Sequence, residues 1–218
     1  MRACRDGCHA SACRALDQAV DRDTELALVD RLRQGDADAF DEVYVTFNTR
    51  LFTFLVRLSR RRDVAEDLLE ETWLRLVRHA RRLRSDTRLG PWLFTVARHL
   101  YVSYSRSRML EDSVAAGLIT LWPFSLECSS PFEAAAANEL ECRIERALAA
   151  MPPASREVLL LVGVAGLDHS DAAGICGITP EALRQRLHRA RETLSKALAR
   201  DLSNKAPALG GMTSCPSR

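Results

Sequence analysis

With 218 residues, the chain can hold one large domain or two small ones. Its hydrophobic fraction of 47% supports packed cores and excludes wholesale disorder. The net charge of +2 says little about partners, but acidic and basic residues are segregated along the chain. The longest uncharged run, residues 113–126, is shorter than the ~20 apolar residues of a membrane span, so no membrane insertion is expected.

Residues 1–22 are predicted to form a disordered N-terminal extension that contains cysteines. They lack the apolar core of a signal peptide, which favours a cytoplasmic protein with reduced thiols. The spacing C-x3-C-H-x3-C differs from the C-x2-C pairs of common zinc sites, so we predict no metal and no cofactor. The remaining candidates for a metal or redox site are Cys4, Cys8, His9 and Cys13. The alternatives are an unstructured tail or a start codon placed too early in the gene.

Two amphipathic helices are predicted next. The first spans Thr24–Gln34 and ends at Gly35, after which Asp36 can cap the second. In the second helix, apolar residues recur at steps of three and four, which is typical of a core-facing stripe. We expect its aromatic residues to lie in the core: Phe40, Tyr44, Phe47 and Phe54.

A third helix has acidic and basic ends. Asp63 and Glu66 have the spacing of a capping box at its start. Acidic residues fill its first two turns and arginines gather at its far end, in the sense that the helix dipole favours. Because clustered carboxylates repel phosphate, we expect the acidic face to meet a basic protein partner.

A fourth helix is predicted to start at Gly90-Pro91, since proline suits the first helical position. Along it, aromatic residues alternate with Arg98, His99 and Arg106. Rings that stack on bases, beside guanidinium groups that hold phosphates, are typical of single-strand binding, at roughly 1–3 kcal/mol per stacked base. Periodicity alone is equally compatible with solvated amphipathic helices of an ordinary bundle.

Residues 109–137 contain no Lys or Arg and include two prolines, which predicts a flexible linker. A second domain is predicted for residues 138–202, followed by a disordered tail, 203–218. In this domain Asp168 can open a short helix, Gly177 makes a turn and Thr179-Pro180 starts a second helix, the order of a helix-turn-helix. Arginine can bond guanine and glutamine can bond adenine from such a second helix. The alternative is a terminal bundle helix with a solvated basic face.

Two blocks of sequence resemble a known family. AEDLLEETWLRLVRH followed by PWLFTVARHLYVSYSRSR closely resembles the most characteristic segment of bacterial RNA polymerase sigma factors of the extracytoplasmic-function (ECF) group. MPPASREVLLL, GLDHSDAAGICGIT and RQRLHRAR resemble the domain of the same family that binds the −35 promoter element. The resemblance covers roughly residues 23–198. It implies an all-α fold with a sigma-2-like helical bundle, 23–108, and a sigma-4-like helix-turn-helix domain, 138–202.

The resemblance implies a sigma factor that is not an enzyme. Such a protein binds core RNA polymerase, directs it to −35 and −10 promoter elements, assists promoter melting and is usually held by an anti-sigma factor. The implied polymerase-binding residues are Glu66, Asp67, Leu68, Glu70, Glu71 and Trp73. The implied −10 contacts are Trp92, Arg98, His99, Ser103 and Arg106. The implied −35 contacts are Thr179, Arg184, Gln185, Arg186, His188, Arg189 and Arg191.

The family pattern is broken at two positions of the −10 helix. His99 stands where Asn is usual, and Ser103 stands where Asp is frequent. A preference for one −10 sequence therefore does not carry over to this chain. The competing hypothesis is a stand-alone helix-turn-helix regulator, which could respond to metal or redox state through the N-terminal Cys/His cluster.

Overall fold

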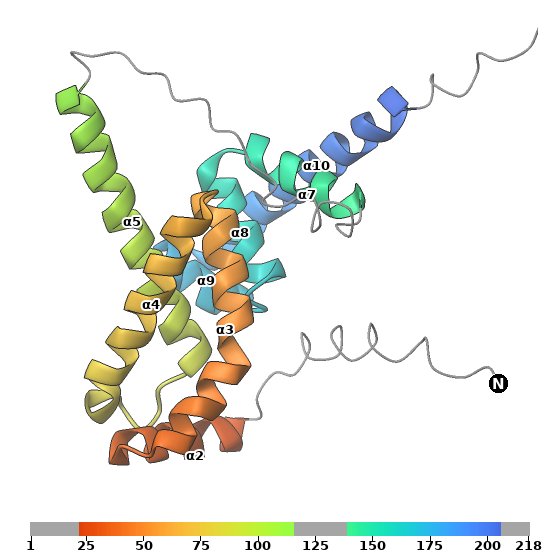
Figure 1. Cartoon of the computed structure of the whole chain (residues 1–218). Coiled ribbons are helices and arrows are strands. Elements are labelled where there is room, and N and C mark those ends of the chain that lie inside the picture. Colours follow the sequence, from red (N-terminus) through yellow and green to blue (C-terminus); the bar gives the residue numbers. More distant parts are fainter. Residues whose placement is uncertain (1–21, 116–138, 206–218) are drawn as a thin grey trace, which may run out of the picture.

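The computed structural model describes residues 22–115 and 139–205, and every regular element in these ranges is helical (Figure 1). We call the first range the N-terminal bundle; it consists of α2 (Arg22–Gln34), α3 (Ala37–Ser59), α4 (Arg62–His79), the short 3-10 helix η1 (Ala80–Arg82) and α5 (Leu89–Ala115). The second range, the C-terminal bundle, consists of α7 (Glu139–Ala150), α8 (Pro153–Gly163), α9 (His169–Cys176) and α10 (Pro180–Lys205). The predicted all-α fold is confirmed for these residues. Cys4, Cys8, His9 and Cys13 lie outside them.

The core of the N-terminal bundle forms where α3 contacts α4 and α5. Leu51, Phe54 and Leu55 of α3 are completely buried. The Phe54 ring meets Phe94 of α5 edge to face, with ring centroids 5.4 Å apart. Not every aromatic residue of α3 lies in this core as predicted. Tyr44 is 41% exposed because it faces a groove on the other side of the helix.

Some helix ends follow local signals and others do not. Asp36 caps α3 as predicted, with its carboxylate accepting the Asp38 N–H at 3.0 Å. The capping box predicted at Asp63 is wrong, because α4 already begins at Arg62 and the Asp63 carboxylate is held by the Arg61 guanidinium. α5 is capped from a distance: the buried carboxylate of Glu25 on α2 accepts the Leu89 N–H at 2.7 Å.

Two predicted boundaries shift. α5 continues to Ala115, so residues 109–115, predicted as the start of the linker, are helical. α10 continues to Lys205, so residues 203–205, predicted as the start of the tail, are helical too. In both places a helix begun by buried residues propagates past its last core contact, since each added residue forms another backbone hydrogen bond.

The C-terminal bundle contains the predicted helix-turn-helix. Asp168 caps α9 by accepting the Asp171 N–H at 2.8 Å, and this bond holds the pKa of the Asp168 carboxyl below its usual range. Gly177 makes the turn with a φ of 66°, a left-handed conformation that suits glycine. Thr179 caps α10 through the Ala182 N–H at 3.2 Å. The inward residues of α10 are buried as predicted at Leu183, Leu187 and Ala190.

The two bundles lie against each other. α3 contacts α7 and α8, while α5 contacts α9. At the first turn of α5 the backbone of Gly90 lies close to Leu167: a Cβ built there would be 3.8 Å from Leu167 Cδ2. Buried residues of both bundles therefore form one continuous core.

Candidate functional site

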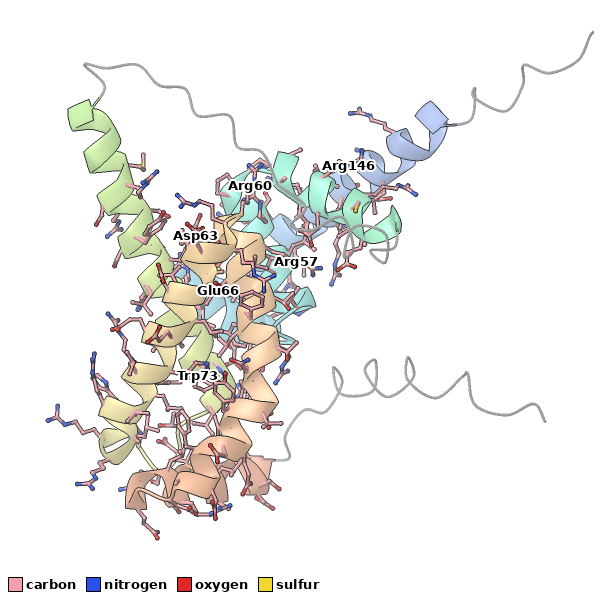
Figure 2. The ribbon with its side chains drawn as sticks, in the orientation of Figure 1. Arg57, Arg60, Asp63, Glu66, Trp73 and Arg146 are labelled. Atoms are coloured by element: carbon pink, nitrogen blue, oxygen red, sulfur yellow. The ribbon has the colours of Figure 1, made fainter. Side chains whose placement is uncertain are left out.

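An apolar groove of about 430 Å³ opens between α3 and α4. Aromatic rings form its floor: the Tyr44 and Trp73 centroids are 5.0 Å apart, and those of Phe40 and Trp73 are 5.9 Å apart. The Trp73 Nε1–H donates to Asn48 Oδ1 at 3.1 Å and so fixes the indole between the two helices (Figure 2). The residues that line this groove are Phe40, Tyr44, Asn48, Phe52, Glu66, Leu69, Glu70, Trp73, Leu74 and Val77.

The rim of the groove is acidic and partly uncompensated. Glu66 pairs with Arg62 at 2.9 Å, and Glu71, beside the groove, pairs with Arg75 at 3.1 Å. Among the residues that the structure describes, Asp67 and Glu70 make no ion pair. Aliphatic side chains complete the surface, with Val77 57% exposed and Leu74 40% exposed. An apolar groove with free carboxylates at its edge fits an amphipathic helix that carries basic residues.

The structure divides the predicted polymerase-binding residues into three groups. Glu66, Glu70 and Trp73 line the groove. Asp67 and Glu71 lie on the adjoining side of α4, outside the lining. The side chain of Leu68 is 7% exposed and lies in the core, where it supports α4 but offers no contact to a partner.

The α3 half of the groove was missed by sequence reasoning. Its residues, Phe40, Tyr44, Asn48 and Phe52, recur at every fourth position, next to the core stripe that includes Val43, Phe47 and Leu51. Two parallel apolar stripes make a helix apolar over more of its circumference than one core contact requires. That excess was the available signal for a second contact surface.

Four of the five predicted −10 residues share one side of α5. Trp92, His99, Ser103 and Arg106 are spaced by seven, four and three residues, which places them on one helical face. His99, Ser103 and Arg106 are exposed, and Trp92 is half-buried against the core. This face offers a half-buried indole, a hydroxyl, an imidazole and a guanidinium to a ligand.

Arg98, the fifth −10 residue, points away from that face toward the C-terminal bundle. Its Nε donates to Glu157 Oε1 of α8 at 2.6 Å, and its side chain is only 20% exposed. The structure therefore does not bring Arg98 together with the other four residues.

The outward face of α10 carries the predicted −35 residues. Arg184 is exposed and is held by Glu181, with Nε 3.1 Å from Oε2, so it reaches a base only after that pair breaks. His188 lies 3.7 Å from Glu192. Arg186 is half-buried on the side of Cys176. The remaining residues are exposed on α10 or at its cap: Thr179, Gln185, Arg189 and Arg191.

Within residues 22–115 and 139–205, no cluster of three or more His, Cys, Asp or Glu residues could hold a metal ion. The same described residues include no helix that is both long and apolar enough to cross a bilayer. The chemistry of these surfaces is that of binding: an acid-rimmed groove and two helical faces with exposed cations.

Comparisons with known proteins find one family in both bundles. The models for Sigma-70 region 2 and for Sigma-70, region 4 match residues 43–111 and 143–194. The RNA polymerase sigma factor CarQ of Myxococcus xanthus is 32% identical over 174 residues, which cover 78% of this chain and 95% of CarQ. The ECF RNA polymerase sigma factor EcfG of Rhodopseudomonas palustris (strain TIE-1) is 36% identical over 148 residues, which cover 68% of this chain and 78% of EcfG.

A solved structure agrees with these relatives. The sigma factor RpoE from Bartonella quintana, in complex with the anti-sigma factor NepR, matches with a TM-score of 0.61 at 27% identity, over 74% of this chain and 98% of RpoE. CnrH, in complex with the cytosolic domain of CnrY, has the same TM-score at 18% identity, over 81% of this chain and 98% of CnrH, which is a likeness of fold.

Proposed function

The chain belongs to the ECF group of RNA polymerase sigma factors, and we propose that it docks on core polymerase through the groove between α3 and α4. The observation that carries this proposal is the groove itself. A regulator that only binds duplex DNA has no need of an aromatic groove rimmed by unpaired carboxylates. A subunit that must hold a basic helix of a larger enzyme does need one.

We assign promoter binding to the two helical faces. The face of α5 formed by Trp92, His99, Ser103 and Arg106 is suited to an opened −10 strand, where rings stack and cations hold phosphate. The outward face of α10 is suited to a duplex −35 element, with Arg184 and Gln185 toward base edges and Arg189 and Arg191 toward phosphates.

The division of labour between the domains is the one proposed from the sequence, with the N-terminal bundle meeting polymerase and the −10 element and the C-terminal bundle meeting the −35 element, although α5 and α10 extend beyond the predicted limits of 23–108 and 138–202. The partners are core polymerase and promoter DNA, together with an anti-sigma factor, since RpoE from Bartonella quintana is solved in complex with the anti-sigma factor NepR. The site of action is the cytoplasm, where core polymerase works, and the role is to bind and position rather than to catalyse.

Run-off transcription tests this function. Purified core polymerase, this protein and the DNA upstream of its own gene should give a discrete transcript that disappears without the protein. Co-elution with core but no transcript would point to the wrong promoter. Neither transcript nor co-elution, from folded protein, would favour the stand-alone regulator.

A charge reversal tests the docking surface. Asp67→Arg with Glu70→Arg should weaken core binding about 100-fold, because both carboxylates lack an internal ion pair and the reversal opposes a basic partner. The matched control is Asp23→Arg with Glu141→Arg, which reverses two exposed acids away from the groove and should leave core binding unchanged. Wild-type affinity in the first variant would place the polymerase surface elsewhere.

A further inference from the structure

The exposed side of α4 and η1 changes from acidic to apolar to basic along its length. Asp67 and Glu70 come first, exposed and without an ion pair among the described residues. Leu74 and Val77 follow, 40% and 57% exposed. The exposed arginines that close the series are Arg78, Arg81 and Arg82. Steps of three and four residues place these side chains on one helical face, which we call the α4 face.

The basic end of the α4 face is as open to a partner as its acidic end. Arg78 is 63% exposed, and its Nη1 lies 3.7 Å from Glu71 Oε1, beyond hydrogen-bonding distance. Arg81 and Arg82 make no ion pair in the part of the chain that the structure describes. Charges that the chain leaves uncompensated are available to a surface of complementary charge.

The charges of the α4 face are symmetric about Leu74. Glu70 and Arg78 lie four residues from it on opposite sides, and Asp67 and Arg81 lie seven residues from it. At a helical rise of about 1.5 Å per residue, Asp67 and Arg81 stand about 10 Å from Leu74 in either direction. If two copies of such a helix run antiparallel about a two-fold axis at Leu74, each of these acidic residues meets a basic residue of the other copy.

We propose that two copies of this chain pair through the α4 face, with the two α4 helices antiparallel and the two-fold axis at Leu74. A two-fold contact is isologous, so the pairing of Glu70 with Arg78 and that of Asp67 with Arg81 each occur twice. Leu74 and Val77, exposed in the single chain, become buried at its centre. One helix per copy makes a small interface, so we expect a dissociation constant on the order of 10 μM.

The dimer covers the groove that we assign to polymerase, because Glu70, Leu74 and Val77 belong both to the groove lining and to the α4 face. One chain cannot then bind core polymerase and a second copy at the same time. Self-association therefore holds surplus sigma factor away from polymerase. This consequence rests on the proposed docking function, whereas the dimer itself does not.

Two single charge reversals in the full chain test the pairing. Glu70→Arg brings arginines together across the axis, and Arg78→Glu brings carboxylates together. Each variant alone should therefore self-associate at least about 100-fold more weakly than the wild type. An equal mixture of the two variants should dimerise within about two-fold of the wild type, because each altered residue then meets its opposite charge. Sedimentation velocity in reducing buffer measures this, at about 50 μM chain so that the wild type is mostly dimeric.

The matched control mixes Asp23→Arg with Lys196→Glu, which reverse one exposed acid and one exposed base outside the α4 face. Each control variant should dimerise as the wild type does, alone and in the mixture. A monomeric wild type, or dimers that persist in both Glu70→Arg and Arg78→Glu, would overturn the proposal. A mixture of those two variants that stays monomeric would overturn it too, since the charges would then not face each other.

Core binding is measured separately, with labelled wild type at nanomolar concentration, where the chain is monomeric. Failure to bind core there would remove the docking function and leave the dimer standing. At the concentration of the sedimentation experiment, an equal amount of core should convert dimers into complexes that contain one copy of the chain. Complexes that contain two copies would overturn the exclusion of polymerase by the dimer.

Discussion

Arg156 should be the most costly single residue to replace in the C-terminal bundle. Its side chain is buried, and it donates three hydrogen bonds to carbonyl oxygens: Leu148 at 2.8 Å, Ala149 at 3.0 Å and Met151 at 3.0 Å. Two of these carbonyls, those of Leu148 and Ala149, belong to the last turn of α7, where the helical N–H partners run out; the Leu148 carbonyl also accepts the Met151 N–H at 3.1 Å. One guanidinium therefore closes the end of α7 and the turn into α8.

The magnitude follows from those three bonds. Arg156→Met keeps most of the alkyl packing and leaves the carbonyls without this donor, at about 1–2 kcal/mol each. Part of that loss is offset, because burial lowers the pKa of Arg156 and its removal ends the desolvation of a charge. The free energy of unfolding should fall by about 3 kcal/mol.

Urea unfolding followed by far-ultraviolet circular dichroism measures this change. Arg191→Met, on the exposed face of α10, is the matched control and should stay within about 0.5 kcal/mol of wild type. Arg156→Lys should fall between the two, since one ammonium cannot reach three carbonyls in the geometry of a planar fork. A loss below about 1 kcal/mol in Arg156→Met would show that the three hydrogen bonds do not hold the turn.

Three further outcomes are expected. Glu25→Ala removes the cap of α5 and should lower the free energy of unfolding by about 1–2 kcal/mol relative to the control Asp23→Ala, measured by urea titration. Equal free energies of unfolding in the two variants would mean that water replaces the cap. Arg184→Ala should cost about 1–3 kcal/mol in −35 binding and relax preference at one base pair, whereas a uniform loss across sequences would identify a phosphate contact. Burial raises the pKa of the Cys176 thiol to about 11. Alkylation of Cys176 at pH 8, followed by mass spectrometry, should therefore be roughly 100-fold slower in the folded chain than in urea. Similar alkylation rates in the two conditions would show that the helix-turn-helix opens readily.

Features encoded within a few residues could be predicted from the sequence. The cap at Asp36, the turn at Gly177 and the cap at Thr179 each depend on one residue and on backbone groups within four positions of it. The buried stripe of α10 follows in the same way from helical spacing. The capping box at Asp63 had the correct local spacing and was still wrong, because the neighbouring Arg61 competes for the carboxylate.

Features that join distant parts of the chain could not be predicted. Glu25 caps a helix whose first residue, Leu89, lies 64 positions away. The pair between Arg57 and Glu145 spans 88 positions. A glutamate on an amphipathic helix has the same local pattern whether it is solvated or buried beneath another helix, so only the packing of the bundles distinguishes the two cases. The same limit applies to the groove, which needs α3 and α4 side by side.

The compact chain leaves some of the proposed binding surfaces open and covers others. The groove and the outward face of α10 are exposed, whereas Arg98 is covered. A ligand shifts a two-state equilibrium only by its difference in affinity for the two states. DNA that contacts α10 alone binds both states equally and so cannot part the bundles. A ligand therefore uncovers Arg98 only if it binds the chain with its bundles apart more tightly than the compact chain.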